Sequence, residues 1–320
     1  MTHKIAVLDR LTLDAGDVSW HPLQKLGELL LFDQLKESDF KKHLSGVPFI
    51  LSNKVVIGDE HLAVLPALRY IGVLATGYNN IDITAARMRG ITVCNIPSYS
   101  TFSVAQMVFA YILHFSQHAG YHSALVKEGR WARSPIFCFW EKPLLELSGR
   151  VLGIIGYGAI GRQVARIARA FGMKVLVHTR SSFKTDDDQI QAAEREELFS
   201  GSDFISLHCP LTDKTRYIIN EKTLALMKPE AVLINTGRGG LIDEAALDKA
   251  LRARRIRAAA LDVLGEEPPG ERHPLIENPH TLITPHIAWA TRQARQRLID
   301  LAAENIRAFL EGKPINRVLS

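Results

Sequence analysis

The chain has 320 residues, of which 47% are hydrophobic and 23% are charged, values typical of a soluble globular protein with room for two domains. The net charge of +5 is modest and the basic residues are scattered, so we expect no nucleic-acid partner, and small anionic substrates suit this balance. The three cysteines lack metal-ligand spacing and no segment resembles a signal peptide or a membrane span, which predicts a cytoplasmic protein with reduced thiols, no membrane association and no metal.

The first hundred residues alternate short apolar runs with helical stretches. The predicted strands are residues 5–8, 29–32, 49–52, 70–74 and 92–94. Such alternation favours a parallel sheet with helices on both faces. A long amphipathic helix is predicted next, over residues 103–127.

A second alternating series follows the long helix. Its predicted strands are residues 151–155, 174–178, 204–207, 231–235, 258–262 and 281–284. Six strands with crossover helices make a doubly wound sheet. The final predicted helix, residues 288–310, is most easily placed on the first sheet. We therefore expect a discontinuous substrate domain of residues 1–101 and 290–320, and an inserted dinucleotide-binding domain of residues 102–289.

Residues 151–180 have the pattern of a mononucleotide-binding unit. An apolar strand leads into the turn Gly156-Tyr157-Gly158-Ala159-Ile160-Gly161, and a helix-periodic stretch and a second apolar run follow. Gly156 permits the tight turn, Gly158 lets the backbone approach a pyrophosphate, and Gly161 lets helix and strand pack closely. The motif alone would also fit an ordinary tight turn, but its strand–turn–helix–strand setting predicts dinucleotide binding at the start of the helix.

The end of the second strand of this unit departs from the pattern of an NAD site. An acidic residue is expected there to bind the ribose 2′-hydroxyl, yet the chain reads Thr179-Arg180-Ser181-Ser182. The cationic side chain of Arg180 and the neighbouring hydroxyl groups are suited to binding the 2′-phosphate of NADP(H). We therefore predict NADP(H) or NAD(H) as cofactor, with NADP(H) slightly favoured. The alternative is that Arg180 is solvated, or stacks on adenine, with NAD still bound.

Three charged residues follow consecutive predicted strands of the second sheet. Arg238 follows the fourth strand, Glu267 the fifth and His286 the sixth, at the edge where open α/β sheets bind ligands. Arg238 can bind a carboxylate and polarise the adjacent carbonyl. His286 can give a proton to an alkoxide, and Glu267 can orient the ring and favour its protonated form. Singly, each fits a surface or structural role; together they predict hydride transfer to a 2-keto acid.

Other histidines lack this placement. His114, His118 and His122 are spaced by four residues on the long helix, but no carboxylate or cysteine accompanies them, so a polar helix face or a subunit contact is favoured over a metal site. The segment His208-Cys209-Pro210 follows the third strand and is predicted to line the cofactor without a catalytic role.

The chain resembles the D-isomer-specific 2-hydroxyacid dehydrogenases over essentially its whole length, and within them the glycerate dehydrogenase and hydroxypyruvate/glyoxylate reductase branch. The matching segments are 75–82, 156–161, 208–212, 235–239, 262–268 and 285–288. The resemblance implies a Rossmann cofactor domain inserted into a flavodoxin-like substrate domain, and oxidoreduction of hydroxypyruvate or glyoxylate to D-glycerate or glycolate.

The resemblance also implies roles for individual residues. Backbone N–H groups around Thr76 and Gly77 would hold the substrate carboxylate beside Arg238. Asp262 would lie near the nicotinamide carboxamide and Val104 under the ring; Cys209, Pro210, Thr236, Gly237, Arg238 and His286 complete the predicted cofactor set. Relatives are usually homodimers joined through the cofactor domains. Trp140 is the candidate for an aromatic residue that approaches the partner's substrate site, although simple interface packing explains it equally well.

Two other functions compete with this interpretation. A formate dehydrogenase on the same scaffold needs no proton transfer at a substrate hydroxyl, so the Glu267–His286 pair argues against it. A cofactor-sensing binding module of the corepressor type can keep the catalytic residues. That function predicts flexible partner-binding tails, which the sequence does not show.

Overall fold

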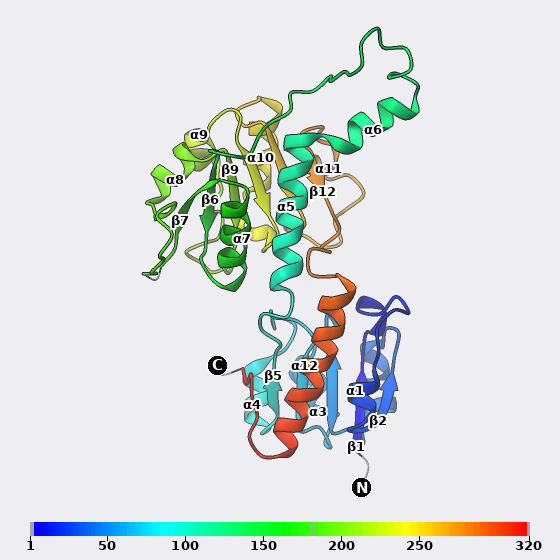
Figure 1. Cartoon of the computed structure of the whole chain (residues 1–320). Helices are drawn as coiled ribbons and strands as arrows, with labels where there is room; N and C mark the ends of the chain where they lie inside the picture. The colour runs from blue at the N-terminus through cyan, green and yellow to red at the C-terminus, as the bar shows by residue number, and fades with distance from the viewer. Residues whose placement is uncertain (1–2, 181, 319–320) are drawn as a thin grey trace. The chain divides into compact units, whose positions relative to one another are not determined.

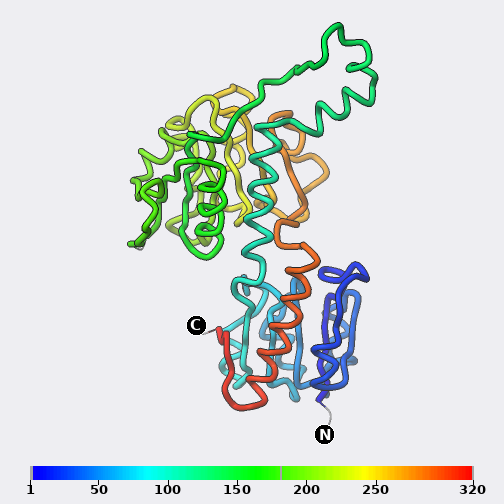
Figure 2. Tube along the Cα trace, viewed as in Figure 1, coloured from blue at the N-terminus to red at the C-terminus, as the bar shows by residue number. Residues whose placement is uncertain are grey.

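The computed structural model describes residues 3–180 and 182–318. The chain forms two compact units: residues 1–100 with 289–320 make the first, and residues 101–288 make the second. The first unit is therefore built from both ends of the chain, as the colours of the trace show (Figure 2).

The first unit contains a five-stranded parallel sheet in the order β2-β1-β3-β4-β5 (Figure 1). Its strands are β1 His3–Val7, β2 Gly27–Leu31, β3 Phe49–Ser52, β4 Tyr70–Val73 and β5 Thr92–Cys94. Its helices are α1 His21–Gln24, α2 Phe40–Leu44, α3 Asp59–Ala63, α4 Ile83–Met88 and α12 Arg292–Leu310, with 3-10 turns at Arg10–Thr12 and Glu37–Asp39.

Successive side chains of a strand point to opposite faces of the sheet. They therefore pack in two different hydrophobic cores. Ile5 and Val7 pack with Leu298 of α12, whereas Ala6 packs with Phe40 on the other face. Both faces are thus covered, as a parallel sheet requires.

The second unit contains a seven-stranded parallel sheet in the order β12-β11-β10-β9-β6-β7-β8. Its strands are β6 Val151–Ile155, β7 Lys174–His178, β8 Ile190–Ala192, β9 Phe204–Leu207, β10 Val232–Asn235, β11 Ala258–Leu261 and β12 Thr281–Ile283. Its helices are α5 Thr101–Gln117, α6 Ala119–Lys127, α7 Ala159–Ala170, α8 Arg195–Gly201, α9 Glu221–Leu226, α10 Glu244–Arg252 and α11 Pro274–Glu277, with a 3-10 turn at Gly239–Leu241. This is the doubly wound Rossmann order with one further strand at the edge, and the predicted fold class is confirmed.

The last helix begins at Arg292 and not at residue 288 as predicted, and two larger details also differ from the sequence prediction. The edge strand β8 was not predicted, because Ile190 is its only large apolar residue and its pairing with β7 defines it. The predicted helix over residues 103–127 is two helices, α5 and α6, since His118 between them has a left-handed φ of 48°. Arg257 supports the break: its guanidinium donates to the carbonyl of Phe115, at the end of α5.

The strand order sets the position of the predicted catalytic residues. β10, β11 and β12 are neighbours and run parallel, so their carboxyl ends meet at one edge of the sheet. Arg238, Glu267 and His286 follow these three strands in turn. The fold of the second unit therefore places all three residues along the edge where such sheets bind ligands.

Candidate active site

The glycine turn between β6 and α7 has the backbone that a dinucleotide needs. Gly156 has a φ of +97°, and a Cβ there would lie 2.5 Å from the backbone nitrogen of Cys209. A Cβ on Gly161 would lie 2.2 Å from the carbonyl oxygen of Gly156, so only glycine lets α7 begin this close to the strand. Nothing lies within 4 Å of a Cβ built on Gly158. That space, in front of the first N–H groups of α7, fits a pyrophosphate.

The remaining residues of the turn frame this space. Ala159 begins α7 and is exposed, whereas Tyr157 and Ile160 are half-buried and pack against the core of the unit. The Tyr157 ring stacks obliquely on Phe183, with ring centroids 4.5 Å apart. The glycine-turn backbone is thus anchored on its inner side and open on its outer side.

The end of β7 carries no acidic side chain. Thr179 is half-buried and Arg180 is exposed, and within the described chain Arg180 forms no hydrogen bond or ion pair. Ser181, also predicted to bind the cofactor, lies outside the described residues. The guanidinium of Arg180 is therefore free to meet a negative charge at the end of this strand.

The segment after β9 forms a neutral wall beside Gly156. Desolvation lowers the pKa of His208 to about 4, so its ring is neutral near pH 7, and Nε2 lies 2.9 Å from the Ser206 hydroxyl. Burial likewise raises the pKa of the Cys209 thiol, which keeps it protonated. Pro210, which follows, is exposed. These residues can line a cofactor site, but none of them presents a charge to the cofactor.

Glu267 and His286 form a direct hydrogen bond, with Nδ1 of the ring 2.6 Å from Oε2 of the carboxylate. A carboxylate only accepts, so Nδ1 carries the proton and donates it to Glu267. The other oxygen, Oε1, accepts the backbone N–H of Leu264 at 3.0 Å. The side chains of His286 and Glu267 are 26% and 33% exposed. The ring is therefore oriented by a fixed carboxylate and remains reachable from solvent.

The loop that carries His286 is held by Asp262, at the end of β11. His286 has a left-handed φ of 53°, unusual for a residue with a side chain. Its N–H donates to the Asp262 carbonyl at 2.8 Å, and the Asp262 carboxylate accepts the N–H groups of Ile287 and Ala288 at 2.9 and 2.7 Å. Asp262 is 1% exposed. Its position fixes the backbone of the histidine and of the two residues that follow it.

Arg238 lies in a tightly braced loop after β10. The Asn235 side chain accepts the N–H of Gly237 and donates to the carbonyl of Arg238, at 3.0 and 2.9 Å. A Cβ on Gly239 would lie 2.0 Å from the carbonyl of Leu264, so this loop touches the loop of Glu267. The Arg238 residue is exposed, and among the described residues its guanidinium donates only to the neighbouring Gly237 carbonyl. It can therefore turn to a ligand.

Two further predicted cofactor residues lie in the second unit. The Thr236 hydroxyl, just after β10, is buried and has no hydrogen-bond partner among the described residues. A buried hydroxyl without a protein partner at this edge fits a polar group of a ligand. Val104 lies on α5 and is 5% exposed.

The predicted carboxylate-binding residues, Thr76 and Gly77, lie in the first unit after β4. The Thr76 hydroxyl donates to the carbonyl of Ile96, and the Asn95 amide donates to the carbonyl of Thr76. Among the described residues, the backbone N–H groups of Thr76 and Gly77 have no acceptor. Two adjacent N–H groups without acceptors can bind an anionic oxygen.

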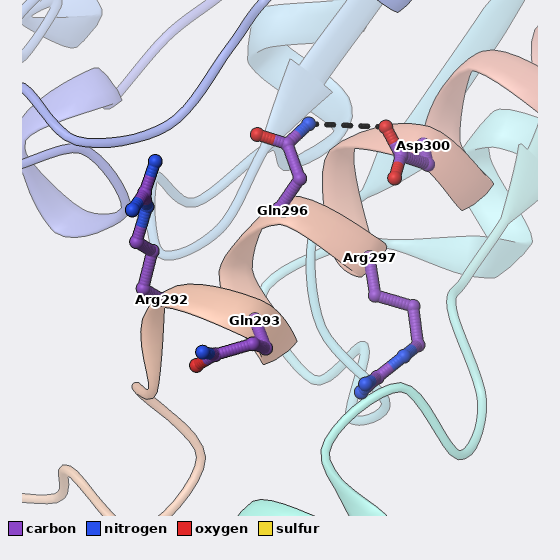
Figure 3. A pocket seen from close by; sticks show the side chains of 5 residues that line it. All are labelled: Arg292, Gln293, Gln296, Arg297 and Asp300. Carbon is purple, nitrogen blue, oxygen red and sulfur yellow. Dashed lines mark hydrogen bonds between the residues drawn. The ribbon is translucent and has the colours of Figure 1, made fainter.

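A pocket of about 500 Å³ in the first unit lies along the N-terminal half of α12 (Figure 3). Five side chains line it: Arg292, Gln293, Gln296, Arg297 and Asp300. Arg292 donates to the carbonyl of Asp17, Arg297 to that of Tyr99, and Gln296 to Asp300. Arg292 and Arg297 thus tie α12 to neighbouring loops, whereas the bond between Gln296 and Asp300 lies within the helix. None of the predicted site residues lines this pocket.

Trp140 lies on an arm made of α6 and the loop over residues 128–147, which extends away from the sheet of its unit (Figure 1). Its side chain is 65% exposed and lines a pocket of about 310 Å³ within the arm.

Within the described chain no group of three or more histidine, cysteine or acidic residues could hold a metal ion. No described helix is long and apolar enough to cross a membrane.

Sequence comparison decides the family. Residues 109–288 match the NAD-binding domain of the D-isomer-specific 2-hydroxyacid dehydrogenases. The chain belongs to this family. A hydroxypyruvate reductase from Blautia hydrogenotrophica is 41% identical over 98% of this chain and 99% of its own length. A glycerate dehydrogenase from Methylorubrum extorquens is 38% identical over 99% of both chains. The protein is thus an oxidoreductase of the 2-hydroxyacid dehydrogenase class.

A solved structure extends the similarity to the whole fold. An acyclic imino acid reductase in complex with NADPH and D-Arg superposes with a TM-score of 0.84 at 34% identity, over 99% of this chain and 100% of that one. Family membership accounts for both parallel-sheet units.

Proposed function

We propose that this dehydrogenase reduces a small 2-keto acid, hydroxypyruvate or glyoxylate, to D-glycerate or glycolate with NADPH or NADH. The 2.6 Å contact between Glu267 and His286, at the edge of a Rossmann sheet, is the observation that carries the proposal. The names of the two curated relatives favour it over a formate dehydrogenase or a cofactor-sensing binding module. The free thiols are compatible with the cytoplasmic location that we also propose.

In this proposal His286 supplies the proton. When bound, the reduced nicotinamide supplies a hydride to the carbonyl carbon of the substrate. The protonated ring of His286 then donates from Nε2 to the forming alkoxide, because Nδ1 is committed to Glu267. Glu267 stabilises the positive ring before the transfer and keeps its orientation after it.

Arg238 would bind the acid group of the substrate. The guanidinium of Arg238 offers parallel donors to a carboxylate and raises the electrophilicity of the neighbouring carbonyl. We also propose Thr76 and Gly77 as substrate-binding residues, because their N–H groups have no acceptor in the described chain and can bind an anionic oxygen. The proposed cofactor residues are Val104, Gly156, Tyr157, Gly158, Ala159, Ile160, Gly161, Thr179, Arg180, Ser181, Cys209, Pro210, Thr236, Gly237, Arg238, Asp262 and His286.

Product analysis tests the proposed reaction. The protein is incubated with hydroxypyruvate and a reduced cofactor deuterated at C4 of the nicotinamide, on one face and then on the other. Chiral chromatography with mass detection should find D-glycerate, with one deuterium at C2 from one of the two labelled cofactors. L-glycerate would refute the D-specific reaction, and the absence of glycerate would rule out hydroxypyruvate as the substrate.

Glu267→Gln is expected to lower kcat for hydroxypyruvate reduction by about 10- to 100-fold, because the imidazolium of His286 loses its anionic hydrogen-bond partner. The measurement is kcat for hydroxypyruvate reduction. The neighbouring exposed Glu266 provides the matched control, and Glu266→Gln should leave kcat unchanged. Identical kcat values for wild type and Glu267→Gln would remove Glu267 from the acid–base pair.

We also propose that NADPH is preferred over NADH. Arg180, exposed at the end of β7 with no partner in the described chain, would bind the 2′-phosphate. Arg180→Ala should raise KM for NADPH by about tenfold and leave KM for NADH within about twofold, since a charge-assisted contact with phosphate is lost. Equal changes of KM for both cofactors would show that Arg180 does not bind the 2′-phosphate.

We further propose that the protein is a homodimer in which the arm of α6 and residues 128–147 packs on a second copy. Large apolar side chains on this arm are exposed: Trp131, Ile136, Phe137, Trp140 and Leu144. Phe137 is 88% exposed. Such a cluster is typical of a surface that a partner covers. Trp140 is the arm residue proposed to approach the partner's substrate site.

Replacing Ile136 and Phe137 together by aspartate should convert the dimer to a monomer, because two charges would have to be buried in the interface. Light scattering after size-exclusion chromatography measures the mass. Met88→Asp changes an exposed apolar residue of the first unit and should leave the mass unchanged. A monomeric wild-type protein would contradict the proposed dimer.

A further inference from the structure

A chain of side-chain hydrogen bonds connects α5 to the loop that carries His286. The hydroxyl of Tyr111, on α5, lies 2.5 Å from Oγ1 of Thr284. The Thr284 hydroxyl in turn donates to Oδ1 of Asp262. Tyr111 is 2% exposed, so its hydroxyl has little access to water. The same carboxylate of Asp262 holds the N–H groups of Ile287 and Ala288. The chain therefore ends on the backbone next to His286.

The direction of each hydrogen bond follows from the groups involved. An ionised Asp262 only accepts, so the single proton of the Thr284 hydroxyl is used for Asp262. The Thr284 oxygen must then accept from Tyr111. Burial raises the pKa of Tyr111 to about 12, which keeps the phenol protonated as the donor. Hydrogen bonds in series polarise one another, so donation by Tyr111 strengthens donation by Thr284.

Asp262 depends on these donors to stay ionised. Burial raises the pKa of its carboxyl group, and the hydrogen bonds from Thr284, Ala288 and Ile287 oppose that rise. The titratable side chains that interact with it are His286, whose positive charge would also favour the ionised form, and Tyr111. A protonated Asp262 would lose acceptor capacity on one oxygen, and with it one of the contacts that hold the loop.

The helix α5 also holds the far end of this loop. The Ser103 hydroxyl donates to the carbonyl of Ala288 at 2.6 Å. His286 lies between Thr284 and Ala288, the two residues of the loop that contact α5. It keeps its left-handed conformation there. A residue held in that region needs surrounding contacts that leave no alternative.

We propose that Tyr111 is a positioning residue, which acts through Thr284 and Asp262 to hold the backbone of the His286 loop. Tyr111 does not contact the substrate directly. It acts on the placement of the His286 ring, which donates the proton. The activity readout of this inference rests on the proposed reductase function, whereas the structural readout does not.

Amide hydrogen exchange of the peptide over residues 284–290 gives the structural readout. Tyr111→Phe removes only the hydroxyl, and Thr284→Val removes the relay hydroxyl with little change of volume. Each variant should increase exchange of this peptide about threefold to tenfold relative to wild type at the same pH, because one buried hydrogen bond is lost. The double variant should exchange no faster than Thr284→Val alone, since Tyr111 acts through Thr284.

Tyr70→Phe is the matched control, because Tyr70 is also a fully buried tyrosine and lies in the core of the first unit. It should leave exchange of the 284–290 peptide at the wild-type rate. Unchanged exchange in both Tyr111→Phe and Thr284→Val, or effects of the two that add in the double variant, would overturn the relay.

Kinetics give the second readout. Tyr111→Phe should lower kcat about fivefold with KM for hydroxypyruvate within about twofold, and should move the acid limb of the kcat profile up by about 0.5 pH unit, because Asp262 then protonates more easily. A merely structural loss would lower the amount of active protein without moving the limb. If wild type reduces no keto acid, the proposed function fails, and the exchange experiment alone still decides the relay.

Discussion

His286→Ala is expected to lower kcat for hydroxypyruvate reduction by about 10³-fold, because a positioned general acid contributes about 10²–10⁴ to such a step. No other described residue replaces a proton donor held by Glu267 at 2.6 Å. Binding of NADPH, measured by quenching of protein fluorescence, should change by less than about threefold, since phosphate contacts lie at the glycine turn. The variant separates chemistry from cofactor binding.

The control for this variant is His280→Ala. His280 directly precedes β12, at the opposite end of the strand from His286, and should retain kcat within about twofold because it is remote from the sheet edge that binds ligands. If His286→Ala kept wild-type kcat across the pH range, another group would have to be the proton donor, and the central role given to the pair would be wrong.

Arg238→Ala is expected to lower kcat/KM for the keto acid by about 10²–10³-fold, because two charge-assisted hydrogen bonds to the carboxylate are lost. KM should rise and kcat should fall together, since the guanidinium both binds the acid group and polarises the carbonyl. Arg238→Lys should recover only part of the loss, because an ammonium group cannot form the parallel pair of bonds. Steady-state kinetics with hydroxypyruvate measure all three proteins.

An arginine outside the site tests whether the loss is specific. Arg252 lies at the end of α10 and pairs with Asp248 one turn earlier. Arg252→Ala should change kcat/KM by less than about twofold, as exposed helix pairs contribute little. A comparable loss in Arg252→Ala and Arg238→Ala would point to a general effect of charge instead of carboxylate recognition.

The Rossmann unit could be predicted because its signals are local. Gly156, Gly158 and Gly161 stand within six residues, and the strand and helix on either side are periodic. The proximity of Glu267 and His286 could be predicted because parallel neighbouring strands end at one edge. The structure shows that hydrogen bond directly.

Other features could not be predicted because they depend on contacts distant in the sequence. The break at His118 is supported by Arg257, which is 139 residues away. Tyr111 has the periodicity of an ordinary core residue, and its hydroxyl partner Thr284 is 173 residues away. Asp262 was expected near the cofactor, but its support of the 287–288 backbone appears only when β11 and β12 lie side by side.

The proposed reaction is tested by initial rates with NADPH and NADH, each against hydroxypyruvate, glyoxylate and pyruvate. We expect turnover of hydroxypyruvate or glyoxylate well above that of pyruvate, with NADPH the better cofactor. Because one structural relative is an imino acid reductase, the same cofactors are also offered with pyruvate and methylamine. Turnover of the imine alone, or no oxidation of either cofactor with any of the three keto acids, would contradict the proposed reaction.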